Sequence, residues 1–178
     1  MKAKRISLHG AAGSGKTTLA GELFVYFKKL GVRVEYVSEL ARQWAMIERP
    51  VTGCDQVYLF ASQLHAEDTP LSRGKADLVI TDSPLYLSCY YTSVSPTPMY
   101  TTPLLKCANE FDKQYSNVNF FCHPHPDYVF HTEGRYCNKD DSHIVSGDIL
   151  RFVRDQADVI ELPDDDRLKY IIDYLNGV

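Results

Sequence analysis

The sequence lacks three features, and each absence removes a class of protein. It has no excess of positive charge, since 19 Lys and Arg residues stand against 23 Asp and Glu residues, and the net charge is -4 at pH 7. It has no apolar run near the roughly 20 residues that a membrane helix needs. Its five cysteines form no CxxC pair and are odd in number, which is a poor framework for disulfides. Nucleic acid is therefore a disfavoured partner, no membrane partner is expected, and an untargeted protein of the reducing cytoplasm is favoured.

The length and the apolar content favour one ordinary globular domain. The chain has 178 residues, and 44% of them are hydrophobic. This supplies a core without a structural metal or disulfide. We expect a single domain over residues 1–178.

Short β-prone segments alternate with segments of helical periodicity. The pattern predicts strands at residues 5–10, 32–38, 77–81, 117–122 and 158–162. Helices are expected at 19–30, 39–48, 55–67, 104–115, about 143–155 and 164–177. This alternation predicts an α/β fold.

Two segments break the alternation. Residues 84–103 are rich in proline, tyrosine and hydroxyl groups, which predicts an irregular segment on the acceptor side of a site. Residues 123–142 are expected to form a mobile loop, a lid, although 127–132 are as β-prone as the fourth strand and are a rival to it.

The segment GAAGSGKT, residues 10–17, matches the pattern G-x-x-x-x-G-K-[ST] in full, between a predicted strand and a predicted helix. Its glycines let backbone N–H groups turn around phosphate oxygens, at the positive end of the helix that follows. Lys16 is placed to reach the β and γ phosphates, and Thr17 to ligate Mg²⁺. ATP and Mg²⁺ are the expected cofactors, and the nucleotide is expected at Gly10, Gly13, Ser14, Gly15, Lys16, Thr17 and Thr18.

Other nucleotide-binding classes fit less well than a phosphotransferase. A GTPase needs a guanine-reading Asn-Lys-x-Asp sequence, which the chain lacks. A ring-forming AAA-type ATPase is longer and carries a separate helical domain after its core. A small phosphotransferase is favoured.

Two carboxylates end predicted strands, at the edge where ligands of open α/β sheets bind. Asp82 follows the third strand and is the candidate for holding Mg²⁺, while a turn cap in Asp82-Ser83-Pro84 is the alternative. Glu39 ends the second strand and is the candidate general base and acceptor ligand, with Arg42 holding a polar or anionic group of the acceptor. The alternative for Glu39 and Arg42 is an ordinary helix-surface pair.

Four further side chains are weaker candidates. Arg135, in the lid, is expected to reach the γ-phosphate, against the alternative of a solvated arginine. Gln63 is expected to donate and accept hydrogen bonds at a nucleobase edge, against the alternative of a solvated glutamine. Trp44 and Tyr58 are candidates to stack on a base or to belong to the core. The cysteines and histidines of residues 122–137 match no usual zinc spacing.

Several segments together resemble the small P-loop kinases related to ribosylnicotinamide kinase and to nucleoside and nucleotide monophosphate kinases. These segments are GAAGSGKTT, SELARQW, FASQLHAED, VITDSPL, NVNFF and GRY. The resemblance implies a three-layer αβα fold with a five-stranded parallel sheet, Mg-ATP as phosphoryl donor and a closing lid. It assigns phosphate and metal binding to Lys16 and Thr17, metal binding to Asp82, the base to Glu39 and the lid arginine to Arg135. Small viral proteins of this type are similar, so a host cytoplasm is one expected setting.

The resemblance leaves the acceptor open. Deoxynucleoside kinases carry a Glu-Arg-Ser sequence where this chain has Thr81-Asp82-Ser83. The expected function is transfer of a γ-phosphate to a hydroxyl or phosphate of a nucleoside-like or nucleotide acceptor, by a monomer or homodimer. The alternatives are a kinase of a hydroxymethylated pyrimidine within DNA, which the net charge does not favour, and a nucleotide-dependent switch or assembly ATPase.

Overall fold

The computed structural model describes residues 4–96, 98–125, 136 and 139–177. Its sheet has five strands, all parallel, in the order β2-β3-β1-β4-β5. This confirms the predicted α/β fold and its five-stranded parallel sheet. The strands are β1 (Arg5–His9), β2 (Val34–Val37), β3 (Leu78–Thr81), β4 (Asn117–Phe121) and β5 (Val159–Glu161).

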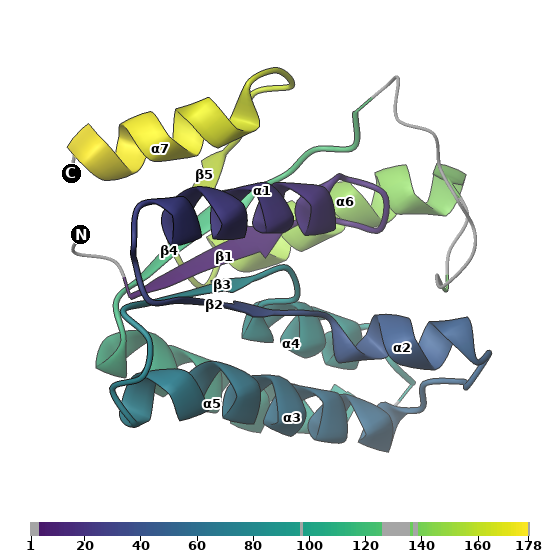
Figure 1. Ribbon diagram of the computed structural model, residues 1–178. Helices are drawn as coiled ribbons and strands as arrows, with labels where there is room; N and C mark the ends of the chain where they lie inside the picture. The colour runs from purple at the N-terminus through teal and green to yellow at the C-terminus, as the bar shows by residue number, and fades with distance from the viewer. Residues whose placement is uncertain (1–3, 97, 126–135, 137–138, 178) are drawn as a thin grey trace.

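Helices cover both faces of the sheet and make three layers (Figure 1). In the described part of the chain they are α1 (Lys16–Lys29), α2 (Leu40–Met46), α3 (Gly53–Ser72), α4 (Leu85–Ser93), α5 (Thr101–Gln114), α6 (Lys139–Arg154), α7 (Arg167–Gly177) and the short 3-10 helix η1 (Pro98–Tyr100). The helices α1 and α7 pack on one face, and α3, α4, α5 and α6 pack on the other.

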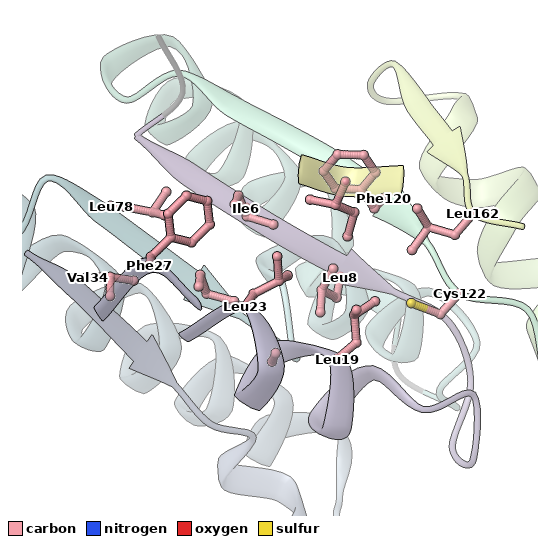
Figure 2. Packing of buried hydrophobic residues seen from close by; sticks show 13 residues of the cluster. Ile6, Leu8, Leu19, Leu23, Phe27, Val34, Leu78, Phe120, Cys122 and Leu162 are labelled. Carbon is pink, nitrogen blue, oxygen red and sulfur yellow. The ribbon is translucent and has the colours of Figure 1, made fainter. Parts of the chain in front are cut away.

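The face beneath α1 and α7 has an apolar core (Figure 2). Because side chains alternate along a strand, Ile6 and Leu8 of β1 both point to this face. Both are fully buried, and they pack with Leu19, Ala20, Leu23, Phe27, Val34, Leu78, Ile80, Phe120, Cys122, Leu162 and Ile171. The predicted apolar stripe of α1 therefore covers the centre of the sheet.

The other face of β1 is polar and just as buried. Arg5 is 1% exposed and Glu67, on α3, is 0% exposed. The Nε and Nη2 atoms of Arg5 donate to Oε2 of Glu67 at 3.0 and 2.8 Å, and Nη1 donates to Oδ1 of Asp112, on α5, at 2.5 Å. A charge taken out of water is tolerated only when its partners surround it. Arg5 therefore ties the central strand to α3 and α5.

The polar network continues along β1 and β4. The Oγ of Ser7 donates to Oδ1 of Asn117 at 2.9 Å, and Nδ2 of Asn117 donates to Oδ1 of Asn119 at 2.9 Å. The same Asn119 oxygen lies 3.0 Å from Nε2 of His9, which immediately precedes the phosphate loop. Burial lowers the pKa of His9 to about 4, so its ring is neutral. Because the amide oxygen of Asn119 can only accept, Nε2 of His9 donates this bond. Tyr86 on α4 joins by donating to Oδ2 of Asp112 at 3.2 Å.

Part of the segment at residues 84–103 was wrongly predicted to be irregular, because it contains the helix α4 and the 3-10 helix η1. Seven of the nine α4 residues are buried. A helix buried all round has no polar face and therefore shows no periodic stripe in its sequence.

Other boundaries also differ from the predictions. The helix α3 runs past its predicted end to Ser72, and α6 begins at Lys139, inside the predicted lid. Most of that lid, with Arg135 and the rival strand at 127–132, lies outside the described residues, so the lid stays a prediction.

Replacing the buried arginine tests the polar network. Because Arg5→Met leaves the carboxylates of Glu67 and Asp112 unpaired, we expect it to lower the free energy of unfolding by about 3–5 kcal/mol. Arg33→Met is the control, because Arg33 pairs with Asp77 at an exposed site, where such a pair is worth about 0–1 kcal/mol. Urea denaturation measures both, and equal losses would contradict the role of Arg5.

The buried histidine makes stability depend on pH. The folded-state pKa of His9, about 4, lies below the value of 6.5 expected when the chain is unfolded, so the unfolded state binds the proton more readily between these values. Stability should therefore fall as the pH drops below 6.5, and His9 should contribute roughly 2 kcal/mol of loss at pH 5. In urea denaturation, His9→Gln should remove this contribution to the fall in the free energy of unfolding at low pH. His65→Gln, at an exposed site, should leave the pH dependence of the wild type unchanged. An unchanged pH dependence in His9→Gln would contradict this origin.

Candidate functional site

The phosphate loop joins β1 to α1 and follows the conformation that its glycines allow. Gly10, Gly13 and Gly15 all have positive φ angles, of 137°, 82° and 85°. Gly15 stands at the N-terminal cap of α1. A Cβ atom on Gly10 would lie 2.4 Å from the carbonyl oxygen of Cys122, at the end of β4. The loop thus depends on glycine both for its turn and for its approach to the neighbouring strand.

The carbonyl groups of this loop are held by side chains. The Nζ of Lys16 donates to the carbonyls of Gly10 and Ala11 at 2.7 and 2.8 Å, and it lies 3.5 Å from Oγ of Ser14. These bonds fold the Lys16 side chain back onto the loop, and the residue is 9% exposed. The positive charge therefore stands inside the turn that the sequence assigns to phosphate.

Two residues that the sequence analysis missed complete this arrangement. Ser142, on α6, donates from Oγ to the carbonyl of Ala12 at 2.5 Å. Arg167, at the start of α7, donates from Nη1 to the carbonyl of Ser14 at 2.7 Å. With these acceptors occupied, the loop offers its donors to an anion. No sequence pattern links positions 142 and 167 to the loop, because each reaches it only through the folded chain.

The candidate metal site lies beside the loop. The Oγ1 of Thr17 and the hydroxyl of Tyr36 both donate to Oδ2 of Asp82, at 2.7 and 2.8 Å. Burial and the nearby Asp82 charge raise the pKa of Tyr36, which keeps it a donor. Asp82 is 2% exposed, and its Oδ1 has no hydrogen-bond partner among the described residues. An unpartnered carboxylate oxygen beside a hydroxyl is a donor set that suits Mg²⁺, so these residues fit the predicted metal.

The turn-cap alternative for Asp82 lacks a contact that would support it. The N–H of Ser83 donates to Oγ1 of Thr81 at 3.3 Å, not to the Asp82 carboxylate. Tyr36 is a further residue that the sequence analysis missed, since it appeared there only as part of a β-prone segment.

One cleft of about 1090 Å³ joins the phosphate loop to the predicted acceptor residues. Residues of the loop and of the first turn of α1 line it together with Glu39, Arg42 and Gln63. Glu39 caps α2 directly after β2, and Arg42 lies within the first turn of that helix. The apolar part of the wall includes Leu40, Ala45, Met46, Leu59, Leu87 and Tyr91. Of the predicted site residues, Asp82 reaches this cleft through Thr17, and Arg135 lies outside the described residues.

Gln63 differs from its prediction in one respect. It is 5% exposed, so it is not the solvated glutamine of the alternative. Its Nε2 donates to Oε1 of Glu67 at 3.1 Å and to Oγ1 of Thr81 at 2.8 Å. The prediction that Gln63 both donates to and accepts from a nucleobase is therefore corrected. Both of its N–H groups are used within the protein, which leaves only its oxygen for a ligand.

The predicted base-stacking residues Trp44 and Tyr58 contact other residues of the protein. Trp44 and Tyr58 stack on each other with ring centroids 5.6 Å apart, and the Arg49 guanidinium lies 3.5 Å from the Trp44 ring centroid. Neither aromatic ring is among the residues that line the cleft. Stacking of these two rings on a nucleobase is thus unsupported. Trp44 is buried, as the alternative of a core residue expects, whereas Tyr58 is 58% exposed and does not belong to the core.

Two other expectations concern metals and membranes. Within residues 4–96, 98–125, 136 and 139–177, no group of three or more His, Cys, Asp and Glu side chains is arranged to hold a metal ion. Of the cysteine and histidine cluster, His131 and Cys137 lie outside those ranges. None of the helices in the described part of the chain is long and apolar enough to cross a membrane.

Comparisons with known proteins agree with the observed fold. A family model described as an AAA domain matches residues 5–153. A solved structure described as the NadR protein in complex with NR matches with a TM-score of 0.72 and 16% identity, and covers 99% of this chain and 51% of that one. At this identity the likeness shows a shared fold, and the chain spans about half the length of that protein. No curated protein matches.

Gly10 provides a test of the loop. Because Gly10→Ala combines a left-handed φ with a Cβ 2.4 Å from a backbone oxygen, we expect it to lower the free energy of unfolding by about 3 kcal/mol and to abolish ATP binding. Gly21→Ala is the matched control, since it lies within α1 with open space around its Cβ, and it should raise stability by about 0.5–1 kcal/mol. Thermal unfolding and calorimetric titration with ATP measure both effects, and normal ATP affinity in Gly10→Ala would contradict the assigned role.

Proposed function

This chain belongs to the AAA domain family, and from that premise we propose that it is a P-loop kinase that transfers the γ-phosphate of Mg-ATP to a nucleoside-like or nucleotide acceptor. The single observation that carries this proposal is the shared cleft. Residues of the phosphate loop line the same cleft as Glu39, Arg42 and Gln63, which supports a site where donor and acceptor meet. A nucleotide-dependent switch does not need polar groups for a second ligand in the nucleotide cleft.

The residues divide the task as phosphoryl transfer requires. Lys16 and the loop N–H groups hold the phosphates of ATP, and Thr17 and Asp82 hold the metal. Bound Mg²⁺ neutralises phosphate charge. Glu39 accepts the proton of the attacking hydroxyl of the acceptor. The oxygen of that hydroxyl forms a bond to the γ-phosphorus while the bond between the γ-phosphorus and the β-phosphate oxygen breaks, and ADP leaves. Arg135 is the proposed lid residue that stabilises the transferred group.

The charges along the cleft favour a hydroxyl over a phosphate as the attacking group. Among the described residues that line it, the cations are Lys16, which belongs to the phosphate loop, and Arg42, which stands one turn from the Glu39 carboxylate. A phosphate acceptor would bring about two negative charges to a wall with this near-neutral pair. The NadR protein, described in complex with NR, supports a nucleoside-like acceptor.

An acceptor panel tests the proposal. ATP turnover with Mg²⁺ is measured against nucleosides, nucleoside monophosphates, ribosylnicotinamide and hydroxymethylated DNA, with Lys16→Ala as the blank. One acceptor should stimulate turnover and yield a phosphorylated product of the expected mass. Glu39→Gln should lower kcat about 10²- to 10⁴-fold and leave ATP affinity nearly unchanged, because it removes only the proton acceptor.

Each alternative gives a different result in the same panel. Phosphorylation confined to DNA, with binding that weakens steeply as salt rises, would support the DNA-modifying kinase. Slow ATP hydrolysis that no acceptor stimulates would contradict a kinase and support a switch or assembly ATPase. Unchanged turnover in Glu39→Gln would remove that residue from the mechanism.

A further inference from the structure

The buried amide of Gln63 connects the polar network of β1 to the cleft. Gln63 lies on α3, lines the acceptor part of the cleft and is 5% exposed. Its neighbour one turn along the helix is Glu67, which Arg5 holds by two hydrogen bonds. The side chain is therefore fixed from behind by residues that take no part in phosphate binding.

This network decides which atom of the amide faces a ligand. Oε2 of Glu67 accepts both hydrogen bonds of the Arg5 guanidinium in a buried ion pair, and a carboxylate can only accept hydrogen bonds. The NH₂ group of Gln63 must therefore be the end that faces Glu67, and its second N–H goes to Oγ1 of Thr81. A flipped amide would set two oxygens against each other in a buried place. The oxygen of Gln63 is the atom left for a ligand.

We propose that Gln63 presents only its oxygen, a hydrogen-bond acceptor, to the molecule that receives the phosphate. The cleft then selects nucleoside-like molecules whose base carries an N–H donor at that point and rejects those that offer only oxygen or a bare ring nitrogen. The inference rests on the proposed function. The neighbouring wall, with Leu59, Leu87 and Tyr91, is suited to the flat apolar faces of such a base. Amides, amino-substituted rings and ring imides have the required donor.

Glu67 is the positioning residue in this proposal. Glu67→Gln keeps its shape, and Arg5 keeps the carboxylate of Asp112 as a partner. The new amide can donate to Gln63, which permits Gln63 to rotate and present its NH₂ group to the cleft. A purely structural role for Glu67 would change stability or overall activity, but not the preference between two closely matched ligands.

The test uses pairs of ribosides that differ at one group. The pairs are ribosylnicotinamide and its carboxylate analogue, adenosine and purine riboside, and cytidine and its analogue without the amino group. Binding is measured by calorimetry in the presence of Mg²⁺ and a non-hydrolysable ATP analogue, and transfer is measured with ATP. For the scaffold that binds, the member with the donor should be preferred about ten- to hundredfold in affinity and in kcat/KM.

Two variants and a control separate the outcomes. Glu67→Gln should reduce this preference at least tenfold or reverse it, while Glu22→Gln, an exposed change on α1, should leave it as in the wild type. Gln63→Met should bring the ratio within a pair close to one, and thermal unfolding shows that each variant is folded. If Glu67→Gln fails to fold, the ratio measured with Gln63→Met decides.

The two proposals fail in different ways. If the wild type phosphorylates both members of a pair equally, or keeps its preference in Gln63→Met, the selection by Gln63 is overturned while the kinase stands. If no riboside binds although another acceptor of the panel is phosphorylated, the selection by Gln63 is overturned while the kinase stands. If no acceptor of the panel is phosphorylated although ATP binds, the proposed function is overturned and this inference with it.

Discussion

The fold depends on one constraint, the need to surround the buried guanidinium of Arg5. This charge stands on the central strand, and its carboxylate partners come from α3 and α5, 62 and 107 positions further along the chain. The charge is compensated only when both helices sit against β1 at the correct height, because a displaced helix would leave an ion without a partner in a dry environment. Apolar packing alone tolerates sliding, whereas these bonds do not. The network therefore fixes the wall of the cleft against the strand that ends in the phosphate loop.

The loop is in turn held from the second half of the chain. Ser142 and Arg167 reach it across 130 and 153 positions, and each binds a carbonyl that would otherwise compete for the donors around it. Ser142 belongs to α6, which begins at Lys139 within the segment predicted as the lid. A displacement of α6 would therefore break or shift the hydrogen bond from Ser142 to the carbonyl of Ala12 in the loop. Elements from both halves of the chain therefore hold the phosphate loop.

Local sequence patterns could predict the phosphate loop and the strand ends of the site, but not the residues from distant segments that hold them in place. The phosphate loop, the strands that end at Glu39 and Asp82 and the stripe of α1 all follow from short-range spacing, and the structure places them as expected. Arg5 gave no such sign, since an arginine in a β-prone segment is normally solvated. The helix α4 was missed because its burial on all sides removes periodicity. Tyr36, Ser142 and Arg167 act through contacts between distant segments, which no window of sequence contains.

The stack of Trp44 with Tyr58 and Arg49 has a consequence for spectroscopy. Trp44 is the only tryptophan of the chain, and it lies on α2, the short helix that carries Arg42 into the cleft. Arg49, which lies against its ring, also accepts a hydrogen bond at its carbonyl from Tyr136, another residue of the cleft wall, at 2.6 Å. Indole emission depends on the polarity and the charges around the ring. The protein therefore carries a built-in fluorophore whose signal comes from a single place, the helix α2 that also carries Arg42.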